Sequence, residues 1–289
     1  MSEPRAIRLA GGRLAGLCWG EEGAPTWLAL HGWLDNAASF TRLAPLLVRR
    51  LGIRIVAIDF TGHGHSEHVA GDYALWDYCH DLLDAADDLG LERTTLLAHS
   101  MGAGVSCLIA AALPERIGRL VLIDGLGALS TPAGDTAQQL RKGLRAARRS
   151  LSAAPRYPDF ETAVAARVAG GVTPIDADTA APVVERNLSQ EGDGHVRLRT
   201  DGRLLWPSPV RLTPEQVLAL LGAIQAPVLL IEGEGGILGD RESAAAARSS
   251  VSALTRRVLP GGHHLHLESA MVAAVAEAIV DWKALDAGV

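Results

Sequence analysis

The stretch LLAHSMGAG, residues 96–104, places one serine between an apolar run and a run of small residues. The apolar part is typical of the end of a buried strand, and the small residues are typical of the start of a closely packed helix. A nucleophile on such a turn needs small residues two positions before and two after it, because strand and helix cross there. Ala98 and Gly102 meet this need. Ser100 is therefore a candidate nucleophile, and an ordinary helix N-cap serine is the alternative.

Short apolar runs alternate with helical patterns on both sides of this stretch. Uninterrupted Leu-rich and β-branched runs are typical of strands buried on both faces of a parallel sheet. Strands are predicted at 26–32, 53–59, 94–100, 119–125, 227–233 and 254–260, with a hairpin over 6–19. Helices are predicted at 37–51, 73–89, 101–113, 214–224, 240–250 and 268–285. The alternation predicts an α/β fold with a mostly parallel, doubly wound sheet.

One segment interrupts the alternation. Between Gly125 and Thr213 no good strand pattern is found, and helical patterns occur at 135–151, 159–169 and 176–188. An insertion at the end of a strand should lie over the carboxyl edge of the sheet, where ligands of open α/β sheets bind. We therefore expect a core of residues 1–125 and 213–289, and a helical cap of residues 126–212 inserted after the sixth strand.

The composition excludes several classes of protein. In 289 residues, 48% hydrophobic content is enough for a large core, and a net charge of −6 gives no electrostatic reason to bind nucleic acid or an anionic membrane. The scattered Cys18, Cys79 and Cys107 suit reduced, mostly buried thiols better than a disulfide framework or a zinc site. The sequence has neither a signal-peptide pattern nor an apolar run long enough for a bilayer. We expect a soluble, cytoplasmic protein without membrane insertion.

A serine nucleophile needs a base, which is usually a histidine oriented by a carboxylate. In enzymes with this kind of turn the chain order is serine, acid, histidine. The stretch GGHHLHLE, residues 261–268, follows the last predicted strand. His263 comes after two glycines that allow the loop to bend toward Ser100, so we favour His263 as the base and His264 as the alternative. A third interpretation is that both are ordinary surface or core histidines.

A second recognisable loop, HGWLDN at 31–36, also follows a predicted strand. Its glycine lets the backbone turn so that amides can face a developing oxyanion. The expected donors are the backbone N–H groups of Trp33 and of Met101, the residue after the nucleophile. A helix cap by Asp35 or Asn36 uses other atoms and is compatible with this role.

A third loop, DFTGHGHSEH at 59–68, is rich in histidine. His63, His65 and His68 could be metal ligands together with the histidines of 263–266, but their spacing fits no familiar zinc pattern. We interpret the loop as a tight, hydrogen-bonded turn. The sequence therefore predicts no metal and no cofactor.

Taken together, HGWLDN, the D-F-x-G-H-G-x-S loop, A-H-S-M-G and G-H-x-x-H-x-E resemble the α/β-hydrolase superfamily, and HGWLDN is distinctive of its serine hydrolase-like branch. The resemblance covers about 25–125 and 214–285, and more weakly DGRLLWPSPVRLTPEQV at 201–217. It implies a hydrolase with a helical cap. Dehalogenases and epoxide hydrolases of this fold use an aspartate nucleophile, so Ser100 favours acyl transfer. We predict cleavage of small carboxylic esters, or of related thioesters or lactones.

The sequence departs from the superfamily at the acid of the triad. Most members carry it in a G-x-x-D turn after the strand that follows the cap, but GEGG at 233–236 has Gly236 there. We favour Asp124, at the end of the preceding strand, where certain haloalkane dehalogenases have their acid. Glu234 or Asp240 is the alternative. If no carboxylate orients the histidine, the protein is a binding or regulatory protein with weak or no catalytic activity. Another alternative is a cofactor-free perhydrolase or haloperoxidase activity, which would use the same triad.

The predicted cap offers two further features. A basic face of its first helix is either solvated or a docking surface for an anionic substrate such as an acyl-CoA. That face comprises Arg141, Lys142, Arg145, Arg148 and Arg149, and Leu140, Leu144, Ala147 and Leu151 lie on another face. Tyr157, Phe160 and Trp206 either line an acyl pocket or, as we favour, pack the core of the cap. The substrate-binding residues and the oligomeric state are not determined by the sequence.

Overall fold

The computed structural model describes residues 3–149, 153–170 and 173–285. Its centre is an eight-stranded sheet in the order β1-β2-β4-β3-β5-β6-β10-β11. Two antiparallel strands, β1 (Arg5–Leu9) and β2 (Leu14–Trp19), form one edge. The remaining strands are parallel: β3 (Thr26–Leu30), β4 (Arg54–Ile58), β5 (Thr94–His99), β6 (Ile117–Ile123), β10 (Val228–Gly235) and β11 (Leu254–Gly262). The predicted mostly parallel, doubly wound sheet is confirmed.

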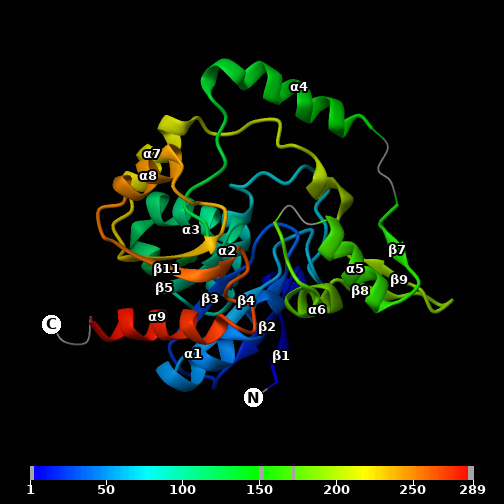
Figure 1. Ribbon diagram of the computed structural model, residues 1–289, viewed down its shortest axis with the longest axis horizontal. Helices are drawn as coiled ribbons and strands as arrows, with labels where there is room; N and C mark the ends of the chain where they lie inside the picture. Colours follow the sequence, from blue (N-terminus) through cyan, green and yellow to red (C-terminus); the bar gives the residue numbers. More distant parts are fainter. Residues whose placement is uncertain (1–2, 150–152, 171–172, 286–289) are drawn as a thin grey trace.

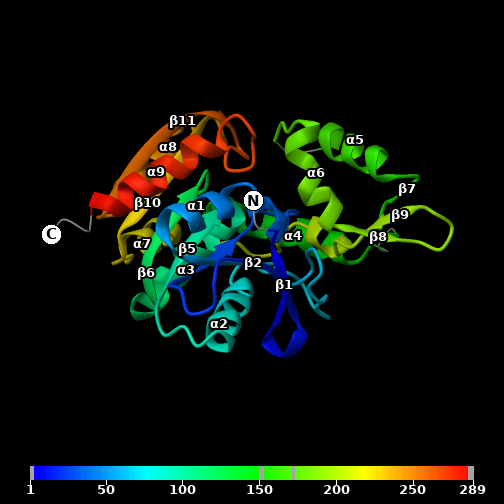
Figure 2. The ribbon, with the colours of Figure 1, turned by 90° about the horizontal axis from the view of Figure 1, so that it is seen from below.

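Helices cover both faces of the sheet (Figure 1, Figure 2). One face packs against α1 (Leu43–Leu51) and α9 (Val272–Leu285), and the other against α2 (Tyr78–Asp88), α3 (Met101–Ala112), α7 (Pro214–Gly222) and α8 (Glu242–Ser250). Because the inner strands alternate their side chains between two buried faces, runs such as Leu28–Leu30 are fully buried. The helix predicted over 37–51 is divided into a 3-10 turn, η2 (Ala37–Phe40), and α1. Four other 3-10 turns are η1 (Ala10–Gly12), η3 (Pro114–Arg116), η4 (Ala133–Asp135) and η5 (Gly202–Leu205).

The segment between β6 and α7 contains the predicted helices and a small sheet that the sequence did not predict. Its helices are α4 (Thr136–Ala147), α5 (Phe160–Gly170) and α6 (Ala177–Arg186). Three antiparallel strands lie in the order β7-β9-β8: β7 (Arg156–Tyr157), β8 (Leu188–Gln190) and β9 (Val196–Leu198). No strand pattern was found in the sequence of this segment, because strands of two or three residues are too short to show an alternating pattern.

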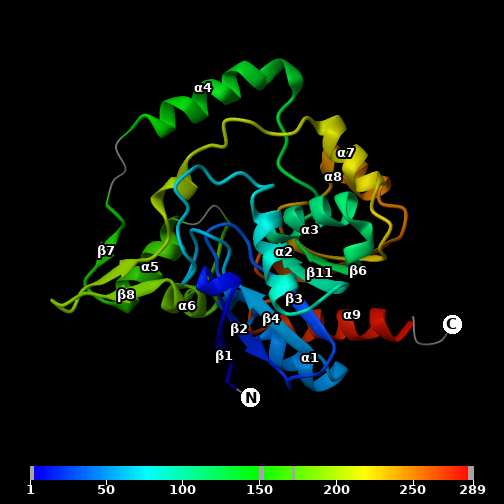
Figure 3. The same cartoon turned by 180° about the vertical axis from the view of Figure 1, so that it is seen from behind.

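The helix α4 packs differently from the expected amphipathic helix. It forms an arch at the top of the molecule in Figures 1 and 3. Gln139 and Gly143 are buried, and the Gln139 Nε2 donates to the Ser208 carbonyl at 2.5 Å. By contrast, Leu140 and Leu144 are 40% and 56% exposed. The basic residues of α4 are exposed as well, and the predicted Leu151 lies outside the described residues.

Two of the three aromatic side chains of the insertion pack against a buried cluster. Tyr157 and Phe160 pack against a buried cluster of α5, α6 and β9. That cluster comprises Ala163, Val164, Ala180, Val184 and Val196. Trp206, which follows η5, is half-buried. None of the helices in the described part of the chain is both long and apolar enough to cross a membrane.

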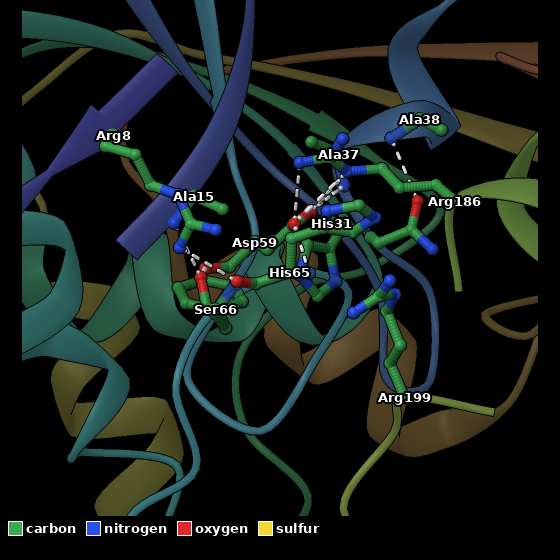
Figure 4. A network of polar contacts seen from close by, with 12 residues as sticks. Arg8, Ala15, His31, Ala37, Ala38, Asp59, His65, Ser66, Arg186 and Arg199 are labelled. Carbon is green, nitrogen blue, oxygen red and sulfur yellow. Dashed lines mark hydrogen bonds and ion pairs between the residues drawn. The ribbon is translucent and has the colours of Figure 1, made fainter. Parts of the chain in front are cut away.

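A buried ion pair joins the insertion to the core (Figure 4). Asp59, directly after β4, accepts the backbone N–H of Ala37 at 2.7 Å and that of His65 at 2.8 Å. The same carboxylate pairs with Arg186, at the end of α6, through Nε at 3.0 Å and a terminal nitrogen at 2.8 Å. The loop of residues 59–68 is thus a hydrogen-bonded turn around Asp59, and this turn also anchors α6.

Replacing Arg186 by methionine is expected to lower the free energy of unfolding by about 3–5 kcal/mol, because the fully buried Asp59 carboxylate would lose its charged partner. Urea unfolding followed by circular dichroism measures the change. The control Arg141→Met removes an exposed arginine of α4 and should stay within about 0.5 kcal/mol of the unaltered protein. Equal stability of the two variants would contradict the anchoring role.

Candidate active site

Ser100 sits on the sharp turn between β5 and α3. Its backbone has φ 51° and ψ −112°, a strained combination for a residue with a side chain. Glycines at two neighbouring positions leave room for this turn. A Cβ on Gly32 would be 3.2 Å from the Ser100 Cβ, and one on Gly125 would be 2.9 Å from the Ser100 Cα. Although Ser100 precedes α3, its side chain makes no capping hydrogen bond. The structure thus gives the hydroxyl no N-cap role.

The Ser100 hydroxyl instead faces His263. The distance from Ser100 Oγ to His263 Nε2 is 3.0 Å, and His263 Nδ1 lies 2.6 Å from Asp124 Oδ2. His263 follows β11 and Asp124 follows β6, so three strand ends bring the three groups together. The Asp124 carboxylate is fully buried, and the His263 side chain is 8% exposed. Serine, histidine and aspartate therefore form one continuous line of polar contacts.

Gly236 explains how Asp124 reaches His263. A Cβ on Gly236 would lie 2.5 Å from the Asp124 Cγ, so only glycine leaves room for the carboxylate. Asp124 Oδ2 also accepts the backbone N–H of Ile237 at 2.8 Å, and Asp124 itself has φ 42°. The two alternative acids, Glu234 and Asp240, are exposed. The space beside Gly236, where the resemblance to the superfamily predicts an acid, is thus filled by a carboxylate from the neighbouring strand.

His264, the alternative base, contacts Asp35, whereas the Ser100 hydroxyl contacts His263. The His264 Nε2 lies 3.1 Å from Asp35 Oδ2. Burial alone would raise the pKa of Asp35, but contacts with His264, His99 and Arg167 hold that pKa well below its usual value. Asn36, the other residue considered as a cap, accepts the N–H of Ala38 at 3.0 Å at the start of η2.

The two amides expected at the oxyanion hole lie on segments that adjoin Ser100. Trp33 follows Gly32, which packs against Ser100, and Met101 is the first residue of α3. Among the described residues, neither backbone N–H has a hydrogen-bond partner, so both donors are available to a ligand. The Trp33 indole donates to the Leu204 carbonyl at 3.0 Å, which links this loop to the insertion.

The histidines of the 59–68 loop have separate partners. His63 Nδ1 lies 3.1 Å from the Thr61 carbonyl, and His68 Nε2 lies 2.9 Å from the Arg199 carbonyl. Burial lowers the pKa of His63 to about 3 and also lowers that of His65. These contacts do not gather the three side chains into a ligand set.

The cysteines lie away from the line of contacts described above. Cys18 and Cys107 are buried, and Cys79 is half-buried. Burial raises the pKa of the Cys79 and Cys107 thiols to about 12, which keeps both protonated and unreactive at neutral pH.

Both the fold and the strand-to-helix turn at Ser100 are those of the α/β-hydrolase fold family, to which this chain belongs, with residues 25–270 matching. More narrowly, the chain is similar to the serine hydrolase-like proteins. The one from Dictyostelium discoideum is 32% identical over 270 residues, which cover 89% of this chain and 75% of the relative. The resemblance inferred from the motifs is confirmed.

Two solved structures are also similar over nearly the whole chain. A hypothetical protein from Pseudomonas aeruginosa PAO1 has 42% identity and a TM-score of 0.87, covering 98% of this chain and 100% of that chain. A thioesterase domain from the curacin biosynthetic pathway has 26% identity and a TM-score of 0.80, covering 96% and 98%. Together with the family match, these similarities support a hydrolase.

Proposed function

We propose that the protein is a serine hydrolase that cleaves small carboxylic esters, or related thioesters or lactones, without a cofactor. Ser100 Oγ attacks the acyl carbon while His263 Nε2 takes the hydroxyl proton, and Asp124 stabilises the resulting imidazolium. The N–H groups of Trp33 and Met101 donate to the oxyanion. His263 returns the proton to the leaving alcohol or thiol. Water then attacks the acyl carbon while His263 takes a proton from it, and His263 gives this proton to Ser100 Oγ as the bond from Ser100 to the acyl group breaks and the acid is released.

The observation that carries this proposal is the alignment of Ser100, His263 and Asp124 over 3.0 and 2.6 Å. A strained serine that contacts a histidine, which in turn contacts a buried carboxylate, has the parts required for an activated nucleophile. The alternative of an inactive binding protein was motivated by the missing acid at Gly236. Because Asp124 supplies a carboxylate at that place, the main argument for an inactive binding protein is weaker.

The division of the chain is part of the same proposal. We infer a core of residues 1–125 and 213–289 and a cap of residues 126–212 that covers the substrate. The cap contacts the loops after β3 and β4, for example through Arg186 and through the Asn36 bond to the Val183 carbonyl at 2.8 Å. Exposed apolar side chains of the cap suit contact with an acyl group; they are Leu129, Leu140, Leu144, Leu205 and Val210.

Incubation with a fluorophosphonate, followed by intact mass measurement, tests the proposal. The phosphonate reacts with a serine only when a base activates it, so the unaltered protein should gain one adduct and Ser100→Ala none. Absence of an adduct on the unaltered protein would contradict an assembled triad. An adduct that persists on Ser100→Ala would assign the reactivity to another residue.

A further inference from the structure

Behind His263 lies a second group of buried polar side chains that the proposed hydrolysis does not use. Asp35, His99 and His264 each offer one ligand atom, and these atoms lie within 4.8 Å of one another. The three side chains are 1%, 0% and 4% exposed, respectively. Burying such groups is costly unless each has a partner.

His99 has one nitrogen that lacks such a partner. Its Nε2 lies 2.9 Å from the His263 carbonyl oxygen, which can only accept, so Nε2 carries the hydrogen. In the neutral ring, Nδ1 then presents a lone pair. This atom lies 3.6 Å from Asp35 Oδ2 and has no hydrogen-bond partner in the described part of the chain. The lone pair of His99 Nδ1 and the Asp35 Oδ2 oxygen therefore face each other without a hydrogen between them. Because both atoms carry negative partial charge, a cation between them would be stabilised.

Two neighbours complete this arrangement. His264 Nε2 lies 3.1 Å from the same Asp35 oxygen and donates its hydrogen to it when no ion is bound. Binding of an ion through Nε2 would leave the ring hydrogen on Nδ1, which is buried and has no hydrogen-bond partner in the described part of the chain. Gly32 leaves space beside the unpartnered atom, since a Cβ there would be 2.9 Å from His99 Nδ1. Two nitrogens and one carboxylate oxygen thus converge on one buried point.

We propose that Asp35 Oδ2, His99 Nδ1 and His264 Nε2 bind a divalent transition-metal ion of the zinc type. Zinc bonds to nitrogen and oxygen of about 2.0–2.2 Å in a tetrahedron separate the ligand atoms by about 3.3–3.6 Å. The separation of 3.6 Å lies at the upper end of that range, the separation of 3.1 Å lies slightly below it, and all three atoms lie within 4.8 Å of one another. Two imidazoles select zinc, nickel or copper over magnesium and calcium, which prefer oxygen ligands. The His99 contact to a carbonyl through its other nitrogen is the outer-shell bond that metal-bound histidines usually make.

The site is placed to act on the catalytic groups, although the binding itself does not depend on the proposed hydrolysis. His99 directly precedes Ser100, His264 directly follows His263, and Asp35 belongs to the loop that carries Trp33. A bound ion would therefore join the three backbone segments on which nucleophile, base and oxyanion donor are carried.

Titration of the chelator-treated full chain with Zn²⁺, by calorimetry, tests the proposal. We expect one ion per chain in the unaltered protein, in Ser100→Ala and in His263→Gln. Affinity should fall by about 100-fold or more in His264→Gln and in Asp35→Asn, because each removes a ligand. Thermal melting without metal checks that each variant is folded, and the visible absorption of bound Co²⁺ provides an independent measure of four-coordinate binding.

The controls separate this site from the triad and from the surface. His68→Gln/His195→Gln removes two partly exposed histidines and should leave Zn²⁺ affinity unchanged. The proposal would be overturned by any of three results. The first is undetectable binding in the unaltered protein, and the second is unchanged affinity in both His264→Gln and Asp35→Asn. The third is loss of binding in His263→Gln or in the surface variant.

Arg167 provides a variant with the opposite expected effect. Its terminal nitrogen lies 3.4 Å from Asp35 Oδ1, so its positive charge competes with a metal ion for the carboxylate. Arg167→Gln should therefore raise the Zn²⁺ affinity by about tenfold or more. A weaker affinity in this variant would show that Arg167 supports the cluster structurally and would contradict cation binding at Asp35.

Discussion

Ser100→Ala is expected to lower kcat for a short-chain aryl ester by about 10⁶-fold, the largest effect that we predict. The alanine removes the atom that would form the acyl-enzyme, and no base can compensate for its loss. The oxyanion donors of Trp33 and Met101 would still bind the substrate, so a residual rate above that of water is expected. Initial rates of alcohol release, measured with a substrate series of increasing acyl length, give the value.

Ser106→Ala is the matched control, because Ser106 lies on the same helix α3 and is fully buried. Its hydroxyl donates to the Gly102 carbonyl at 2.8 Å, within the helix, and does not contact His263. Its rate should remain within a few-fold of the unaltered protein. If Ser100→Ala lost less than about 100-fold, the nucleophile would have to be another group or water.

The fold and the main groups of the candidate site could be predicted because they depend on local patterns. Five of the six parallel strands in the described part of the chain are mostly buried, and such strands are continuous apolar runs that the sequence reveals. The sixth, β11, is a largely exposed edge strand, and it was also located from the sequence. Ser100 and His263 were found from the small residues beside them. Asp124 could be proposed because Gly236 cannot act as an acid, and the structure brings Asp124 to His263.

The features that escaped prediction depend on contacts between residues far apart in the chain. The pairing of Arg186 with Asp59 spans 127 residues, and nothing near either residue indicates it. Likewise, His264 was considered from the sequence as an alternative base and, together with the histidines of the 59–68 loop, as a metal ligand, and His99 was not singled out. The convergence of His99 and His264 on Asp35 follows from the meeting of the β3, β5 and β11 ends, which no local pattern encodes. Leu140 and Leu144 were misleading, since apolar spacing on a helix does not determine which face is covered.

Asp124→Asn is expected to lower kcat by about 10³- to 10⁴-fold, with a smaller effect on KM. Asp124 Oδ2 accepts from both His263 Nδ1 and the Ile237 N–H. An asparagine with its oxygen at this place keeps both bonds but loses the charge that stabilises the imidazolium. With its NH₂ group there, it forces His263 into the wrong tautomer. Glu234→Gln and Asp240→Asn are matched controls and should change kcat by about twofold or less. Similar losses in all three variants would contradict the Asp124 assignment.

Moving the acid from residue 124 to residue 236 tests the same assignment by rescue. In Asp124→Gly/Gly236→Asp, glycine tolerates the φ of 42° at residue 124, and its lack of a side chain frees the space that a Cβ at residue 236 needs. The Cβ of the new aspartate would lie within 2.5 Å of the place that the Asp124 Cγ occupies now. The double variant should recover kcat by about tenfold or more over Asp124→Gly, a gain of about 1.4 kcal/mol. Gly236→Asp alone should lose activity, because two carboxylates would compete for one site. A double variant no better than Asp124→Gly would mean that the two strand ends do not offer equivalent positions to His263.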